Sequence, residues 1–149
     1  MGWKSKVFSP GPSGLVTSAG LLVLRVASGA MIALGHGLPK LKNFGQWAEQ
    51  FPDPLGMGTR LSFLSVLGAE FFCGLVLVLG LATRLMSLPL AFAMAVAAFV
   101  VHQSDPWFVA PGVDGAKELA LLYLIPFVTL LITGPGRYSL DALIAGKGS

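Results

Sequence analysis

Two ionisable residues, Arg25 and Glu70, lie within apolar stretches of this sequence. A charge near the centre of a bilayer costs at least ~2.5 kcal/mol, and such residues usually face the interior of a helix bundle and are paired. Counted along helices from His36 and Arg60, both residues lie about 15 Å deep. The matched depth and opposite charge predict a buried ion pair, which either clamps two helices together or serves ligand binding or proton transfer.

A second group of polar residues is expected near the helix ends on the same side. It consists of His36, Lys40, His102, Lys117 and Glu118. Eleven helical residues make three turns plus about 20°, so His36 and Arg25 share one face of their helix. Because His102 ends one apolar segment and Glu118 begins the next, both should lie at the depth of His36. The sequence therefore predicts a polar pocket at this end.

The residue types in this pocket indicate its chemistry. Histidine donates a hydrogen bond or shuttles a proton near neutral pH, and a glutamate accepts a proton. Such a set suits an anionic or quinone-like head group. The predicted ligand-binding residues are Arg25, His36, Lys40, Glu70, His102 and Glu118, of which Glu70, His36 and Glu118 are the candidate catalytic groups. A facial metal site of His36, His102 and Glu118 is an alternative, but no metal is expected because their spacing matches no metal motif.

Other cofactors and partners are not expected from this sequence. The single cysteine, Cys73, excludes an intramolecular disulfide and every CxxC motif. Both histidines lie at predicted helix ends instead of mid-bundle, which argues against haem, and no set of iron–sulfur ligands is present. The ten Lys and Arg residues are dispersed along the chain, so nucleic acid is not an expected partner.

Four apolar segments must position these residues. They span about residues 15–35, 61–82, 85–103 and 116–133, each near the ~20 residues that cross a bilayer. Only 11% of the residues are charged and the mean hydropathy is +0.77, so the chain lacks the polar surface of a soluble domain. Gly35, Gly37 and Pro39 should end the first segment, and Thr83-Arg84 should join the second and third in a hairpin. We predict an all-α membrane protein, a four-transmembrane-helix antiparallel bundle with residues 1–149 as one domain.

The charged residues between the segments bear on orientation. An even number of crossings places both termini on one side, and the positive-inside rule then compares the Lys and Arg residues of the two sides. The terminal side carries five, Lys4, Lys6, Arg84, Arg137 and Lys147, and the other side carries four, Lys40, Lys42, Arg60 and Lys117. This count favours cytoplasmic termini by one residue.

Four stretches of the sequence carry a family resemblance. They are HGLPKL (36–41), GAEFFCGLVLVLGLATRL (68–85), KELALLYL (117–124) and GPGRYSLD (134–141). Together they resemble the DoxX family, and the likeness runs from about Leu21 to Leu143. It implies a four-helix, multi-pass protein of the bacterial cytoplasmic (inner) membrane, associated with a quinol oxidase or with a thiosulfate:quinone oxidoreductase. It also implies that the recurrent polar positions of the family are Arg25, His36, Lys40, Glu70, Glu118 and Arg137.

We therefore expect a membrane-embedded subunit or partner of a quinone-linked redox system, in which the polar pocket binds a quinone or a small anionic ligand. The expected partners are the lipid bilayer and a redox enzyme, and a homo-oligomer is compatible with the sequence. Whether the chain itself is catalytic stays open. One alternative is a small proton-coupled transporter, because intramembrane Arg, Glu and His also mark proton pathways. Another is a structural or assembly anchor for a redox enzyme, with no activity of its own.

Overall fold

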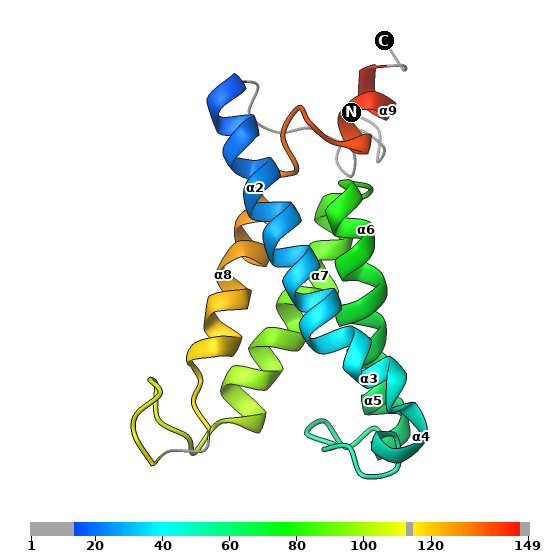
Figure 1. Ribbon diagram of the computed structural model, residues 1–149, viewed down its shortest axis with the longest axis vertical. Coiled ribbons are helices and arrows are strands. Elements are labelled where there is room, and N and C mark those ends of the chain that lie inside the picture. Colours follow the sequence, from blue (N-terminus) through cyan, green and yellow to red (C-terminus); the bar gives the residue numbers. More distant parts are fainter. Residues whose placement is uncertain (1–13, 113–114, 147–149) are drawn as a thin grey trace.

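The computed structural model describes residues 14–112 and 115–146, and all regular structure within these ranges is helical (Figure 1). Three continuous helical stretches, Leu15–Lys42, Thr59–Leu79 and Thr83–Val101, are long and apolar enough to cross a membrane. A fourth apolar helix, Glu118–Thr133, is shorter, with 16 residues. The prediction of an all-α, membrane-embedded helical bundle is confirmed.

The stretches are built from α-helices (α) and π-helices (η) that join end to end. The first contains α2 (Leu15–Ile32), η1 (Ala33–Gly37) and α3 (Leu38–Lys42), and a short α4 (Phe44–Trp47) follows. The second contains α5 (Thr59–Leu67), η2 (Gly68–Cys73) and α6 (Gly74–Leu79). The third contains α7 (Thr83–Val96) and η3 (Ala97–Val101), the fourth is α8 (Glu118–Thr133), and α9 (Leu140–Gly146) ends the described chain.

The first helix does not end where the glycines and Pro39 predicted. It continues through η1 and α3 to Lys42. Pro39 lies in the first turn of α3, where the missing N–H is tolerated, and the wider turn of the preceding π-helix relieves the clash that proline makes within an α-helix. His36 therefore lies inside a continuous helix and not at its end.

Glycines bring the first and second stretches into close contact. A Cβ atom on Gly37 would lie 2.7 Å from the backbone N and Cα of Phe71, and one on Gly29 would lie 2.9 Å from the carbonyl oxygen of Gly74. Side chains do not fit at these distances, and small residues at such crossings are typical of helix packing in membranes. The contact at Gly37 places η1 directly against η2.

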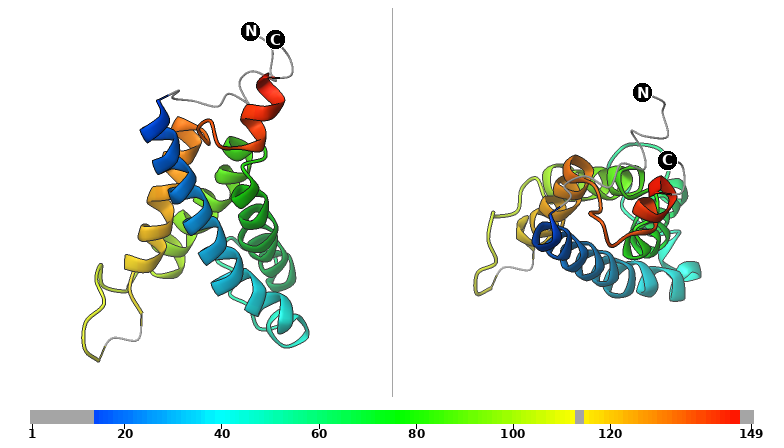
Figure 2. Two further views of the ribbon diagram at one scale, coloured as in Figure 1. Left: turned by 45° about the horizontal axis from the view of Figure 1, so that its top comes forward. Right: turned by 90° about the horizontal axis from the view of Figure 1, so that it is seen from above.

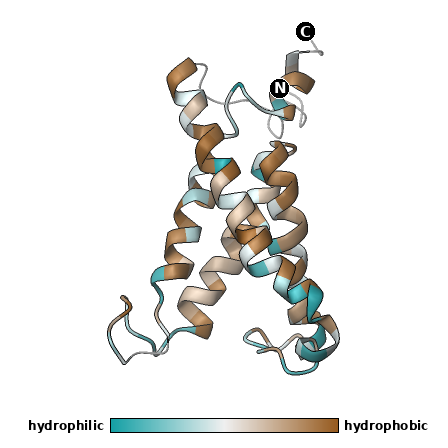
Figure 3. Ribbon diagram, in the orientation of Figure 1, coloured by the Kyte–Doolittle hydropathy of each residue, from teal (hydrophilic) through white to brown (hydrophobic). Residues whose placement is uncertain are grey.

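Apolar side chains form the core and also cover the outside of the bundle. Phe127, Leu77 and Leu90 belong to a core cluster shared by α2, α6, α7 and α8. Large apolar residues such as Val23 and Ile125 are exposed on the helices, and Figure 3 shows hydrophobic residues along all four stretches. A soluble protein rarely exposes so much apolar surface, so the outer face of the bundle lies against lipid.

Candidate functional site

A cavity of about 290 Å³ lies among the first three helical stretches and α8. Its lining is mostly apolar, with five residues that carry polar side-chain groups: His36, Lys40, Glu70, His102 and Tyr123. Four of these five were predicted as ligand-binding residues. The structure thus brings His36, Lys40, Glu70 and His102 to one cavity, and their role in binding stays a prediction.

Each of the three π-helices in the described part of the chain contributes to this cavity. His36 belongs to η1, Glu70 belongs to η2, and Ala97 and Val101 belong to η3. A π-turn is rare because it replaces good α-helical hydrogen bonds with poorer ones, and it occurs frequently at functional sites. Three of them on three different helical stretches, all at one cavity, mark this region as the candidate functional site.

Lys40 and Glu70, which both line the cavity, form an ion pair between the first and second helical stretches. Lys40 Nζ lies 2.6 Å from Glu70 Oε2, and the two side chains are 14% and 6% exposed. The predicted ion pair of Glu70 with Arg25 is therefore wrong. Arg25 lies beside Gly80, which is ten residues and about 15 Å along the helix from Glu70. Because the first helix continues past His36, Lys40 reaches the depth of Glu70 instead.

His36 and Tyr123 form the opposite polar part of the lining. Their rings meet edge to face with centroids 5.4 Å apart. Among the described residues, neither the imidazole nor the phenol hydroxyl has a hydrogen-bond partner, although Tyr123 is only 8% exposed. Because no described residue engages either group in a hydrogen bond, both are available to a ligand that enters the cavity. Sequence reasoning missed Tyr123, although a lone hydroxyl in the apolar run KELALLYL was a usable signal.

His102 lies at the more exposed edge of the cavity. Its Nδ1 is 2.6 Å from Asp105 Oδ2, and the two side chains are 36% and 38% exposed. A hydrogen bond of this kind fixes the orientation of the imidazole and leaves Nε2 for other partners. Lys117, which was predicted nearby, does not line the cavity. Its ammonium donates to the carbonyl oxygens of Gln103 and Asp105 and so holds the loop that carries Asp105.

The structure does not bring Glu118 or Arg25 to the cavity. Glu118 Oε2 accepts a hydrogen bond from the backbone N–H of Val109, 3.0 Å away, in the loop before α8. No group of three His, Cys, Asp or Glu side chains in the described part of the chain is placed to hold a metal ion. The alternative facial set of His36, His102 and Glu118 is thus not assembled.

Arg25 belongs to a separate polar cluster at the opposite end of the bundle. There the segment after α8 folds back across the end of the bundle where α2 begins (Figures 1 and 2). Arg25 donates from Nη1 to the carbonyl oxygen of Pro135 (3.3 Å) and from Nη2 to that of Tyr138 (2.9 Å). Its Nε has no partner among the described residues. The GPGRYSLD segment is therefore the structural partner of Arg25.

Asp141, which sequence reasoning also missed, completes this cluster. It is fully buried, and its carboxylate accepts hydrogen bonds from the backbone N–H groups of Ala82 (2.6 Å) and Thr83 (2.9 Å) at the start of α7. Asp141 also interacts electrostatically with Arg25. Arg137, a predicted recurrent position, contributes its backbone N–H to Ser18 Oγ at 3.2 Å. This end of the bundle is held by hydrogen bonds between side chains and the main chain.

The fold and the cavity together define a multi-pass helical membrane protein with a polar pocket inside an apolar bundle. Comparison with known sequences gives the family. The sequence model of the DoxX family matches residues 20–103, more than half of the chain, and the protein belongs to this family. The match covers His36, Lys40, Glu70 and His102, whereas Tyr123 and the GPGRYSLD segment lie beyond it.

Two bacterial relatives are similar over nearly their whole length. An uncharacterized protein of Haemophilus influenzae is 27% identical over 135 residues, which cover 88% of this chain and 87% of the relative. An uncharacterized membrane protein of Mycobacterium tuberculosis is 26% identical over 164 residues, covering 99% of this chain and 91% of the relative. No solved structure matches the chain.

Proposed function

We propose that the cavity binds the head group of a quinone and that the protein is a membrane-embedded subunit or partner of a quinone-linked redox system. The observation that supports this is that three π-turns, a largely buried ion pair and two hydrogen-bonding side chains meet at one cavity. Ligand sites of this kind are mostly apolar with a few polar groups that fix orientation. The cavity lies within a bundle that contacts lipid, where membrane-soluble quinones reside.

The polar lining fits the chemistry of a quinone. The carbonyl oxygens of the quinone accept hydrogen bonds, which the ammonium of Lys40 and the hydroxyl of Tyr123 can donate. His36 donates or accepts, so it serves both the quinone and the quinol. Reduction of a quinone takes up two electrons and two protons. In this proposal the partner enzyme supplies the electrons, while Glu70 and His36 exchange protons with the bound head group.

The proposal includes a location and a partner. We place the protein in the bacterial inner membrane with cytoplasmic termini, next to a redox enzyme. Both relatives are bacterial, and the Mycobacterium tuberculosis relative is a membrane protein, which supports the location. Co-purification of an oxidoreductase with the native protein would support the partnership, and repeated isolation without one would count against it.

The test is purification from native membranes followed by mass spectrometry of the bound molecules. Wild type should retain a quinone, and Glu70→Gln and His36→Ala should lose most of it because each removes a polar group from the cavity lining. The matched control is Glu118→Gln, which changes a carboxylate that does not line the cavity. Equal quinone content in all four proteins would refute the assignment of the site.

A further inference from the structure

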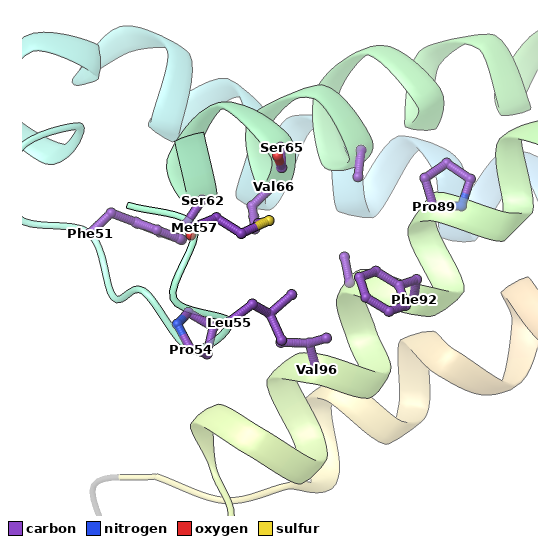
Figure 4. Close-up of a pocket in the computed structure, with 12 residues that line it drawn as sticks. Phe51, Pro54, Leu55, Met57, Ser62, Ser65, Val66, Pro89, Phe92 and Val96 are labelled. Carbon is purple, nitrogen blue, oxygen red and sulfur yellow. The ribbon is translucent and has the colours of Figure 1, made fainter. Parts of the chain in front are cut away.

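A second cavity adjoins the polar one. It has a volume of about 150 Å³ and lies between α5–η2 and α7, beneath the loop of residues 51–58 (Figure 4). Its lining is apolar apart from Ser62 and Ser65, and the hydroxyl of Ser62 already donates to Asp53 Oδ1 at 2.6 Å. A small polar ligand therefore finds few hydrogen-bonding groups here, whereas a hydrocarbon chain would be well accommodated.

The two cavities are neighbours that share part of their walls. Five residues line both of them: Phe51, Pro54, Val66, Ala93 and Val96. Phe51 and Pro54 belong to the loop, Val66 to α5, and Ala93 and Val96 to α7. A molecule seated in the polar cavity thus has an apolar extension directly beside it.

The loop that covers the second cavity is held in place by specific contacts. Asp53 accepts hydrogen bonds from the backbone N–H groups of Met57 (2.9 Å) and Gly58 (2.7 Å) as well as from Ser62. These bonds, that from Ser62 first, hold the pKa of Asp53 below its ordinary value. The ring of Phe51 packs edge to face on Phe63, with centroids 5.3 Å apart. The loop that forms this wall of the second cavity is therefore fixed in position by the fold.

The outer end of the second cavity leads toward lipid. Phe92, which lines this cavity and not the polar one, is 59% exposed on the outside of α7, and Leu55 and Met57 are also exposed at the loop. Exposed apolar side chains on a membrane-spanning helix face the bilayer. The apolar cavity thus lies between the polar cavity and the lipid-facing surface.

From this arrangement we infer that the ligand of the polar cavity is a tailed amphiphile. Its head group lies among Lys40, Glu70 and Tyr123, and its hydrocarbon tail passes through the second cavity beneath the loop to the bilayer. The identity of the head group rests on the proposed function, but the presence of a tail does not. A small soluble anion, which the polar residues alone would also accommodate, is disfavoured by the apolar extension.

The test fills the second cavity without touching the first. Ser65→Phe adds bulk at an exposed position that lines only the second cavity, and Ala69→Leu does so from a buried position. Leu64→Phe is the control, because Leu64 is an exposed neighbour on α5 that lines neither cavity. The probes are 2,3-dimethoxy-5-methyl-1,4-benzoquinone and its decyl-substituted form. Binding is measured at one detergent concentration, so that partition of the tail into micelles is the same for every variant.

Wild type and Leu64→Phe should bind the decyl form at least ~10-fold more tightly than the bare ring, since the tail gains buried apolar surface. In Ser65→Phe and Ala69→Leu this preference should fall to less than ~3-fold while the affinity for the bare ring is unchanged. A wild-type protein without preference for the tail, or filled variants that keep it, would overturn the inference.

A second readout separates this inference from the proposed function. If neither quinone binds wild type, the quinone assignment fails, and the tail is then tested on the amphiphiles that co-purify from native membranes. A tailed molecule present in wild type and Leu64→Phe but depleted in Ser65→Phe would support the inference with another head group. Equal amounts in all three proteins would refute it.

Discussion

Replacing Gly37 with alanine should force apart the two π-helices that carry His36 and Glu70. The added Cβ would lie 2.7 Å from the backbone N and Cα of Phe71 and 2.8 Å from its Cβ. Non-bonded carbons prefer ~3.5–4.0 Å, so η1 and η2 would have to separate by about 1 Å. Because the obstacle is mainly backbone, no side chain can rotate away to make room.

The expected cost follows from this geometry. Overpacking of a well-packed site costs typically ~1–3 kcal/mol, and a contact against backbone belongs at the upper end. A loss of ~3 kcal/mol lowers the ratio of folded to unfolded protein by roughly 100-fold. Gly35→Ala is the control within the same π-helix, because a Cβ there has no atom within 4 Å. Alanine should stabilise the helix at that position by ~0.5–1 kcal/mol.

The assay is unfolding by SDS titration in mixed micelles, followed for both variants by mass spectrometry of the bound ligand. Gly37→Ala should unfold at a lower SDS fraction than wild type and should lose ligand, while Gly35→Ala should match or exceed wild type in stability and keep its ligand. If the two variants are equally stable, the two helices do not make the close contact at Gly37, and the cavity between them has a different shape.

Three further predictions concern the polar groups. Lys40→Met should lower the free energy of unfolding in SDS titration by ~3 kcal/mol, because it leaves Glu70 buried without its counter-charge. The double variant with Glu70→Gln should recover most of this stability but should not bind the ligand. A double variant that binds the ligand normally would contradict the prediction. The pKa of Asp53 is lowered in the folded protein, so its stabilising contribution should be complete above the ordinary aspartate pKa and vanish as the pH falls through the lowered value. Thermal unfolding against pH should show this for wild type and not for Asp53→Asn, and parallel curves would refute it. Asp141→Asn should cost ~1–3 kcal/mol in SDS titration because one cap at the start of α7 is lost, whereas unchanged stability would show the cap to be dispensable.

The sequence predicts the fold class well because the hydropathy of a helix depends directly on whether it contacts lipid. A helix that faces the bilayer must be apolar over about 20 residues, and the three long stretches satisfy this condition. The end of the first helix was beyond such reasoning. Pro39 and its neighbouring glycines usually mark a stop, but here a π-turn accommodates the proline and Gly37 serves a helix crossing instead.

The polar cavity was predicted in part, for a reason that lies in helix geometry. Residue depth can be counted at about 1.5 Å per residue. The count grouped His36 with His102 by placing both at helix ends, and both line the cavity, although His36 lies inside the first helix. It failed for Arg25 because the count assumed that the first helix ends at His36. The π-turns left no trace in hydropathy, because a shift in hydrogen bonding from one carbonyl to the next does not change which residues are apolar.

The charged residues at the two ends of the bundle differ in their hydrogen-bond partners. Asp141 accepts from two backbone N–H groups and Arg25 donates to two carbonyl oxygens, so their bonding is directed at the fold itself. Lys40 and Glu70 share one hydrogen bond, although an ammonium has three donors and a carboxylate about four acceptor positions. Their remaining capacity lies at the cavity, beside His36 and Tyr123.

This difference predicts that variants at the two ends of the bundle lose bound ligand in different ways, which their loss of stability alone would not explain. If buried charge served only to hold helices together, Asp141→Asn and Glu70→Gln would lose bound ligand in proportion to their loss of stability. If the cavity is a ligand site, Glu70→Gln should lose ligand even at temperatures where it is fully folded, whereas Asp141→Asn should lose ligand only as it unfolds. Ligand content measured by mass spectrometry across the unfolding transition of each variant therefore distinguishes a structural charge from one that binds.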